Sequence, residues 1–551
     1  KKKLATIQQV KQRVSTKFKR MRQKSDTTVN IIGGGPCGNL LALYMLSYGL
    51  EVDVYELRSG ADVELKSADN DIEKSSRGRL TSARRRSINL ALSYRGLRAL
   101  ERVGIADLIL RESIEMHSRF VHLADGTTAI QRYGTNADES IYSVSRPRVV
   151  ELLAQVASER GVHYHYNEKF IGIDVDGCPT FASGKKGNTG PIFGCDGAFS
   201  ATRKVMERRG RYDIHIWYAK QGYKELSIPA APCKEKEAWL LPKNYLHIWP
   251  RGEIMLIALP NIDGSFTATL FAPCELLEAM EKRWSRERVE SFLFQHFPDA
   301  VQIMPTILDD FFANPTSPLL QLTLNPWHWQ NKILCIGDAS HATVPFYGQG
   351  MNAAFEDCLA FAEILDKQKS STESRKIFTS STNFVLDVDV VSLSPSPKEN
   401  NHVTVKTNNA NGGGLSDDEQ HLISRHFEPD FTAAFAAMSD SRRIAADGLS
   451  TLAVMNYHDM AQNTASKLYR YRKAVEHIVA SFAPRLWRPL YSMVTFSRMP
   501  YDQVLERHHM QEKFLSAICA SLAFGTAALI AALASRGSSL LFLSKYFYVS
   551  K

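Results

Sequence analysis

A glycine-rich turn follows the first apolar run of the chain. The run VNII at residues 29–32 leads directly into GGGPCG at residues 33–38, and a helical stretch comes next at residues 39–48. A second strand pattern, EVDVY, occupies residues 51–55. This order predicts a strand, a tight turn, a helix and a second parallel strand.

The glycines of this turn occupy the positions that a dinucleotide requires. Gly33 makes the tight turn, Gly35 lets the backbone approach a pyrophosphate, and Gly38 lets the helix pack closely on the strand. The helix N-terminus favours the anion through its free N–H groups and its dipole. Glu56 stands 18 residues after Gly38, where a carboxylate can accept hydrogen bonds from a ribose diol. The combination predicts a dinucleotide-binding unit. The alternative is an ordinary βαβ turn without a ligand.

The positive charge of the chain is concentrated in one segment. The formal net charge is +9, but residues 1–24 hold ten Lys or Arg and no acid, so the remainder is close to neutral. This distribution argues against a nucleic-acid partner. For the basic N-terminal arm, residues 1–25, three interpretations stay open: a solvated extension, a contact with an anionic membrane surface, and a transit-like segment.

The eight cysteines occur singly, with no CxxC pair and no Cys/His cluster at zinc spacing. This usage predicts reduced, mostly buried thiols and no metal site.

Changes in the apolar pattern divide the rest of the chain into segments. We expect a Rossmann-like α/β domain built from two stretches, with an antiparallel-sheet substrate domain between them and a C-terminal helical region after them. A strand and loop are expected at residues 309–318, and the polar composition of residues 369–425 predicts a flexible insertion. The predicted segments are 26–205 and 326–368 for the Rossmann-like domain, 206–325 for the sheet domain, 369–425 for the insertion and 426–513 for the helical region.

Residues 514–534 form a run without any charged side chain, FLSAICASLAFGTAALIAALA. A helix of this length spans roughly 30 Å of hydrocarbon, so the run predicts a C-terminal transmembrane helix that serves as a tail anchor. A short basic tail, residues 535–551, follows it. The alternative is a helix buried in the protein itself.

Two further motifs join the glycine turn. Residues 337–352, GDASHATVPFYGQGMN, and residues 195–197, CDG, make the chain resemble the class A flavoprotein monooxygenases, the aromatic hydroxylases. The resemblance implies non-covalently bound FAD, reduction by NADPH, and transfer of one oxygen atom from O2 to an aromatic ring. The cofactor-binding residues that it implies are Gly33, Gly35, Gly38, Glu56, Arg58, Arg146, Asp196, Asp338, Pro345, Gly348, Gly350, Met351 and Asn352.

Two stretches, residues 86–93 and 245–251, are similar to the members of this class that act on kynurenine. The resemblance therefore implies L-kynurenine as substrate, with the amino-acid carboxylate bound by Arg119 and Tyr133 and further contacts from Asn456 and Tyr491. A guanidinium suits this role because it binds a carboxylate through two parallel hydrogen bonds. The resemblance also implies the mitochondrial outer membrane, with the catalytic body in the cytosol. Two alternatives remain: a hydroxylase of another aromatic acid, and a membrane-tethered FAD-binding scaffold without turnover.

Overall fold

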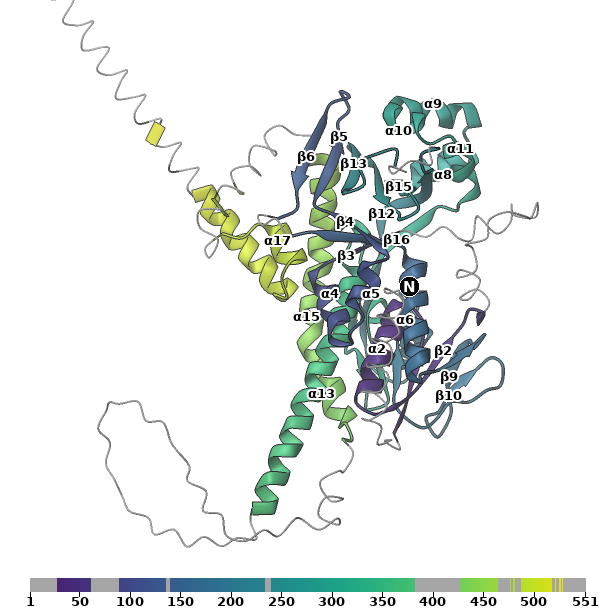
Figure 1. The fold of residues 1–551 in the computed structure, drawn as a ribbon, viewed down its shortest axis with the longest axis vertical. Helices are drawn as coiled ribbons and strands as arrows, with labels where there is room; N and C mark the ends of the chain where they lie inside the picture. The colour runs from purple at the N-terminus through teal and green to yellow at the C-terminus, as the bar shows by residue number, and fades with distance from the viewer. Residues whose placement is uncertain are drawn as a thin grey trace, which may run out of the picture.

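The computed structural model describes most of the chain between residues 27 and 517 (Figure 1). The described residues are 27–60, 89–134, 139–232, 239–381, 427–463 and 487–517, together with 476, 479, 480, 521, 525, 526 and 528. The predicted basic arm and short basic tail lie outside these residues.

The glycine turn belongs to a six-stranded sheet in which β1 (Thr28–Ile32) lies between β2 and β11 and pairs with both in parallel. Four of the five residues of β1 are buried, as expected of a parallel strand covered on both faces. The other strands of the sheet are β2 (Glu51–Glu56), β8 (His163–Tyr166), β11 (Ile192–Gly194), β18 (Ile333–Cys335) and the antiparallel edge strand β17 (His328–Trp329).

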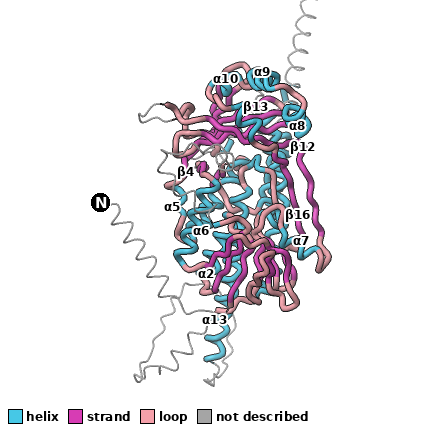
Figure 2. The backbone as a smooth tube through the Cα atoms, turned by 90° about the vertical axis from the view of Figure 1, so that its right-hand side faces the viewer, coloured by secondary structure: helices cyan, strands magenta, loops and turns pink. Residues whose placement is uncertain are grey.

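Helices from distant parts of the chain pack with this sheet into one apolar core (Figures 1 and 2). The helix after the glycine turn, α2 (Pro36–Ser47), starts with proline at its first position and buries residues 38–45. The other helices of this half are α4 (Tyr94–Arg102), α5 (Ala106–Leu110), α6 (Arg146–Arg160), α7 (Ala201–Glu207), α12 (Asp338–His341) and α13 (Gly350–Ser381). Two small sheets complete it, formed by β3 (Leu90–Leu92), β4 (Ser113–Met116) and β7 (Ile141–Val144), and by β9 (Phe170–Ile173) and β10 (Pro179–Phe181).

The second sheet has seven strands and is antiparallel except for the pair β13–β5. The predicted antiparallel sheet at residues 206–325 is therefore present, and the hairpin β5–β6 from the preceding segment extends it. In spatial order the strands are β16 (Ser317–Asn325), β12 (Asp213–Ile228), β15 (Phe266–Pro273), β14 (Ile254–Pro260), β13 (Tyr245–Arg251), β5 (Ser118–His122) and β6 (Thr128–Arg132).

Four short helices cover one face of this sheet and form a second apolar core with it (Figure 1). They are α8 (Cys274–Lys282), α9 (Arg286–His296), α10 (Pro298–Gln302) and α11 (Ile307–Ala313). The strand and loop predicted at residues 309–318 were therefore partly wrong. Residues up to Ala313 complete α11, because Ile307 and Phe311 lie four residues apart and both bury against the sheet.

The C-terminal region is helical, as predicted. The helix α15 (Phe431–His458) continues into a π-helical turn, η2 (Asp459–Asn463), and α17 (Leu490–Thr495) lies beside them in one core cluster. The start of the predicted insertion was wrong, since α13 continues to Ser381. Residues 382–425 lie outside the described part of the chain.

The predicted membrane span at residues 514–534 lies largely outside the described residues. Within the residues that are described, no helix combines the length and the apolar character that crossing a membrane requires.

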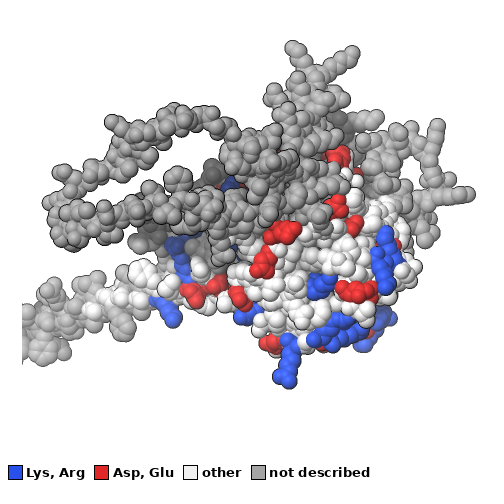
Figure 3. Space-filling model, turned by 90° about the horizontal axis from the view of Figure 1, so that it is seen from below, with Lys and Arg blue, Asp and Glu red and all other residues white. Residues whose placement is uncertain are grey.

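One face of the described structure carries both signs of charge (Figure 3). Lysine and arginine side chains lie there beside aspartate and glutamate side chains. The electrostatic potential of this part of the surface therefore has no single sign.

A buried network of charged side chains ties the C-terminal helices to the first half. Arg95 on α4 is fully buried, and its Nη1 donates to both carboxylate oxygens of Glu356 on α13, at 2.9 and 2.8 Å. Arg442 on α15 contacts the same Glu356 at 3.1 Å, and its Nε donates to Asp357 at 2.9 Å. His341 on α12 pairs with the other oxygen of Asp357.

These contacts favour the charged forms of Asp357 and His341. Burial disfavours the charged form of Asp357, but the neighbouring His341 and Arg442 outweigh burial and lower the pKa of this carboxyl. Burial likewise opposes a charged His341, and Asp357 outweighs it and raises the pKa of the imidazole. Because these charges compensate each other away from water, removing one leaves its partners buried without compensation.

We predict that Arg442→Ala lowers the free energy of unfolding by about 3–5 kcal/mol, the cost of breaking a buried ion pair. Arg443→Ala is the matched control, because this neighbour on the same helix is about one third exposed and, among the described residues, forms an ion pair only with Asp447 one turn away. Its effect should stay within about 0.5 kcal/mol. Urea unfolding of both variants measures the difference, and equal effects would contradict the role given to the network.

Candidate active site

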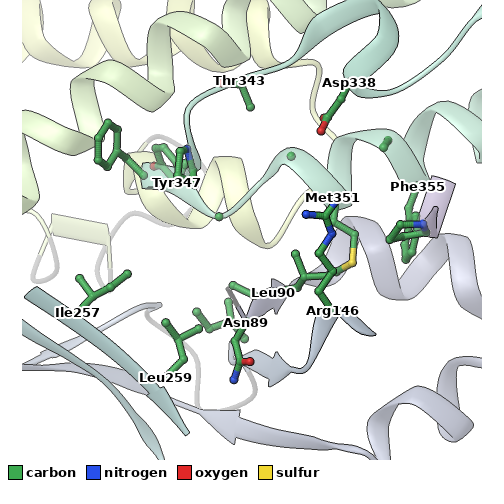
Figure 4. Close-up of a pocket in the computed structure, with 18 of the residues that line it drawn as sticks. Asn89, Leu90, Arg146, Ile257, Leu259, Asp338, Thr343, Tyr347, Met351 and Phe355 are labelled. Carbon is green, nitrogen blue, oxygen red and sulfur yellow. The ribbon is translucent and has the colours of Figure 1, made fainter. Parts of the chain in front are cut away.

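A cavity of about 310 Å³ lies between the glycine turn and the seven-stranded sheet (Figure 4). Its charged lining residues, among those the structure describes, are Arg119, Arg146 and Asp338. From the first half it is lined by Gly35, Pro36, Cys37, Asn89, Leu90, Ala91, Ile141, Cys195, Gly197, Ile336, Thr343 and residues of the 345–355 segment. From the sheet and the C-terminal region it is lined by Leu246, Met255, Ile257, Leu259, Phe271, Met460 and Tyr491.

Gly33, Gly35 and Gly38 of the turn have different steric environments. A Cβ atom on Gly33 would lie 2.5 Å from the carbonyl oxygen of Cys195, and one on Gly38 would lie 2.0 Å from the carbonyl oxygen of Gly33. Gly33 also has a φ of +106°, which favours glycine. By contrast, a Cβ on Gly35 would meet nothing within 4 Å. Gly33 and Gly38 are therefore needed by the fold, whereas Gly35 opens onto the cavity at the N-terminus of α2.

Glu56 lies beside the turn rather than on the cavity wall. Its carboxylate accepts hydrogen bonds from the N–H of Gly34 at 2.7 Å and from the backbone N–H and Nε of Arg58 at 2.9 and 2.7 Å. Burial opposes ionisation of this carboxyl, but the hydrogen bonds and charge of Arg58 and the N–H of Gly34 outweigh it and lower the pKa of Glu56. Glu56, at the end of β2, is thus an anion that is hydrogen-bonded to the glycine turn.

The second motif forms a further part of the cavity wall. Asp338 begins α12 directly after Gly337, whose φ is +65°, and Asp338 lines the cavity with Met351 (Figure 4). Of the other predicted residues here, Pro345, Gly348 and Gly350 also line it.

Asn352 does not line the cavity. It is fully buried, its Nδ2 donates to the carbonyl oxygens of Ala91 and Gly348, and its Oδ1 accepts from the N–H of Ser93. The side chain therefore holds the second motif against β3.

Two further predicted residues flank this wall. Arg146 begins α6 and lines the cavity next to Met351 and Leu90 (Figure 4). Asp196 follows β11, and its Oδ2 accepts hydrogen bonds from the N–H and hydroxyl of Thr202 at 2.9 and 3.0 Å. Its other oxygen, Oδ1, is buried without a hydrogen-bond partner in the described residues, as is the hydroxyl of Thr343 on the cavity wall.

This donor and acceptor set fits FAD. The open space at Gly35 and the free N-terminus of α2 suit a pyrophosphate. The unpartnered oxygen atoms of Asp196 and Thr343 suit the hydroxyl-rich chain of a flavin nucleotide, because a buried polar atom without a partner is costly.

The four predicted substrate residues come together, although they are up to 372 positions apart in the chain. The ring of Tyr133 stacks on Tyr491, with centroids 5.0 Å apart and planes at 15°. The guanidinium carbon of Arg119 lies 4.8 Å from the ring centroid of Tyr491 and 5.8 Å from that of Tyr133. Its Nη2 donates to Oδ1 of Asn456 at 3.3 Å.

This cluster combines one cation with an apolar surrounding. Burial raises the pKa of Tyr133 well above its usual value and raises that of Tyr491, so both hydroxyls stay protonated at neutral pH. Both rings pack in one apolar cluster with Leu246 and Ile257. Arg119 and Tyr491 line the cavity, while Tyr133 and Asn456 stand behind them.

No histidine stands on the described cavity wall. His341, within the second motif, instead pairs with Asp357 and stacks on Trp327, with ring centroids 5.0 Å apart. It therefore has a structural role.

The sequence did not reveal which sheet residues face the cavity. Met255, Ile257 and Leu259 line it, whereas Ile254, Leu256 and Ala258 of the same strand pack against the core with α8–α11. Side chains alternate between the faces of a strand, but both sets are apolar here. The alternation of side chains along β14 separates the two sets. Because both sets are apolar, it does not show which of them faces the cavity.

The comparisons with known proteins agree with this architecture. The family described as FAD binding domain matches residues 26–380. A kynurenine 3-monooxygenase from Dictyostelium discoideum is 35% identical over 476 residues, which cover 86% of this chain and 89% of that protein. One from Sus scrofa is 31% identical over 508 residues, covering 91% of this chain and 90% of that protein.

Among solved structures, the tetrameric form of 2-methyl-3-hydroxypyridine-5-carboxylic acid oxygenase superposes with a TM-score of 0.54 at 16% identity, covering 80% of this chain and 95% of that chain. At this identity the likeness establishes the fold alone. The family match and the long alignments establish more: the chain belongs to the kynurenine 3-monooxygenase family of FAD-dependent proteins.

Proposed function

We propose that this protein is an FAD-dependent monooxygenase that uses NADPH and O2 to hydroxylate L-kynurenine to 3-hydroxykynurenine. Relatives that align with 86% and 87% of this chain carry the name of this activity. The observation that carries the proposal is the position of Arg119, a buried guanidinium flanked by two tyrosine rings on the wall of the same cavity as the glycine turn.

The residues that would hold FAD lie at one side of this cavity. Gly35 and the first turn of α2 would bind the pyrophosphate, Glu56 the ribose, and Asp338 with Asp196 the chain that leads to the flavin ring. Arg146 and the 348–351 segment would contact the ring. Bound FAD supplies the redox chemistry, namely its own reduction by NADPH and the activation of O2 for transfer to the aromatic ring.

The protein's part is to bind and orient the substrate and to exclude water. Arg119 would bind the amino-acid carboxylate, because a guanidinium donates two parallel hydrogen bonds in a fixed plane. The hydroxyls of Tyr133 and Tyr491 are neutral donors beside it. Met255, Ile257 and Leu259 present an apolar wall that suits an aromatic ring and keeps the site dry.

The arrangement needs no side chain as a general base. Kynurenine carries an amino group that already activates its ring, and the described cavity wall has only one acid, Asp338, which the cofactor would occupy. A scaffold without turnover would bind FAD equally well. Kynurenine-dependent oxidation of NADPH separates the two, since a scaffold would oxidise NADPH at the same rate with or without the substrate.

We also propose that residues 514–534 anchor the protein in a membrane, and that this membrane is the mitochondrial outer membrane. Support comes from the sequence: 21 residues carry no charge, and basic residues at positions 536, 545 and 551 follow them. Glycine and serine within the run are compatible with a membrane helix.

Gly35→Ala should preserve the fold but weaken FAD binding, because the new methyl group enters open space that the pyrophosphate would need. Gly38→Ala should instead destabilise the protein itself, since its Cβ meets a backbone carbonyl. Flavin fluorescence titration and thermal unfolding of the FAD-free variants measure the two effects. If Gly35→Ala binds FAD as tightly as the wild type, the pyrophosphate does not bind at Gly35.

Arg119→Ala should raise the KM for kynurenine by about 30-fold or more, because loss of a buried charged partner costs roughly 2–5 kcal/mol. Arg119→Lys should recover only part of the loss, since an ammonium cannot donate in the same fork. Arg132→Ala on the exposed face of the same hairpin is the control and should leave KM unchanged. Steady-state kinetics at matched flavin content measure the KM for kynurenine of each variant. An unaltered KM in Arg119→Ala would contradict the binding of the substrate carboxylate by Arg119.

A chain ending at residue 513 should be released from membranes without detergent and still bind FAD, since the described FAD-side residues all precede that point. The full-length protein should resist extraction with alkaline carbonate. If the full-length protein washes off, or the shortened one stays with the membrane, the anchor is not residues 514–534.

A further inference from the structure

Three cysteines from three separate segments meet beside the glycine turn. Cys37 lies in the first turn of α2, Cys195 directly follows β11, and both line the cavity, while Cys358 is buried on α13. The Sγ atoms of Cys37 and Cys358 are 3.9 Å apart, and the Cys358 thiol also approaches the carbonyl oxygen of Cys37 at 3.6 Å. The cofactor role does not account for this grouping, since glycines and backbone N–H groups bind the pyrophosphate.

We propose that Cys37 and Cys358 form a redox-modifiable pair, oxidised to a disulfide by hydrogen peroxide when FAD is absent and protected when FAD is bound. The gating by FAD rests on the proposed function, whereas the pairing of the two thiols rests on geometry alone. A disulfide requires the two sulfur atoms to approach by roughly 2 Å from their present separation.

The environment makes Cys37 the reactive thiol. Hydrogen bonds from the thiols of Cys195 and Cys358 lower the pKa of Cys37 to about 6. The N-terminus of α2 acts in the same direction, because its dipole stabilises a thiolate. Burial and the neighbouring Cys37 raise the pKa of Cys358 and Cys195, so these two remain protonated. Cys37 is therefore the most acidic of the three thiols.

The reaction balances as a two-electron oxidation. The Cys37 thiolate attacks one oxygen of hydrogen peroxide, the O–O bond breaks, and hydroxide leaves and takes up a proton, which gives a sulfenic acid and water. The Cys358 thiol then attacks the sulfenic sulfur, an S–S bond replaces the S–O bond, and the proton of Cys358 leaves with the second water. The two sulfur atoms together lose the two electrons that the peroxide gains.

FAD controls access because Cys37 reaches solvent through the cavity wall where the cofactor would lie. Cys358 has no exposed route of its own, since it is fully buried. If only the FAD-free protein reacts, FAD at about 100 times its Kd leaves about one hundredth of the protein reactive, so oxidation should slow about 100-fold.

The test treats the full-length protein, with and without FAD, with hydrogen peroxide, blocks the remaining thiols with iodoacetamide and maps disulfides by mass spectrometry. Trypsin with a glutamate-specific protease separates Cys358 from Cys335, because Glu356 lies between them. The expected product is a Cys37–Cys358 disulfide that dithiothreitol reverses and that FAD suppresses.

Cysteine variants provide the controls. Cys358→Ser should stop disulfide formation and leave a sulfenic acid at Cys37 that dimedone traps, while Cys274→Ser, outside the cluster, should leave the reaction unchanged. Absence of the Cys37–Cys358 bond in the FAD-free protein, or a bond from Cys37 to Cys195 instead, would overturn the pairing. Oxidation at the same rate with and without bound FAD would overturn the gating. A flavin titration run in parallel identifies the separate case in which the protein does not bind FAD and the proposed function itself fails.

Discussion

At the turn between β1 and α2, two backbone segments approach more closely than any side chain would permit. A Cβ on Gly38 would lie 2.0 Å from the carbonyl oxygen of Gly33, and one on Gly33 would lie 2.5 Å from that of Cys195. This contact lets α2 start directly over the carboxyl ends of β1 and β11, where an open α/β sheet binds its ligand. The open space at Gly35, on the wall of the cavity, follows from that approach.

The substrate side of the site, with Arg119, Asn456 and Tyr491, depends on the buried charge network. Arg95, Glu356, Asp357, Arg442 and His341 hold the C-terminal helices against α4 and α13. Those helices deliver Asn456 and Tyr491 to the hairpin that carries Arg119. A single cavity thus combines a cofactor side built by local backbone geometry with a substrate side assembled from residues far apart in the chain. The network links the two sides energetically, since its charges are stable only together.

The sequence predicted those features whose cause is local. Glycines with a steric role and the acid at the end of β2 could each be recognised from residue type and spacing. Arg119, Tyr133, Asn456 and Tyr491 were found only through the family resemblance, because no local pattern connects them. The apolar strand β14 did not show which of its faces lines the cavity. The polar composition from residue 369 onward suggested a flexible insertion, but α13 continues as far as Ser381, because a helix already packed in the core extends at little cost.

We propose that one cavity binds both FAD and the carboxylate of kynurenine, whose aromatic ring is then hydroxylated. The most direct measurement supplies the FAD-loaded protein with NADPH, L-kynurenine and isotopically labelled O2, and determines the mass of the product. We expect 3-hydroxykynurenine carrying one labelled oxygen atom, formed together with kynurenine-dependent NADPH oxidation and strongly reduced in Arg119→Ala at the same kynurenine concentration. A product without the label, or NADPH oxidation that does not respond to kynurenine, would contradict it.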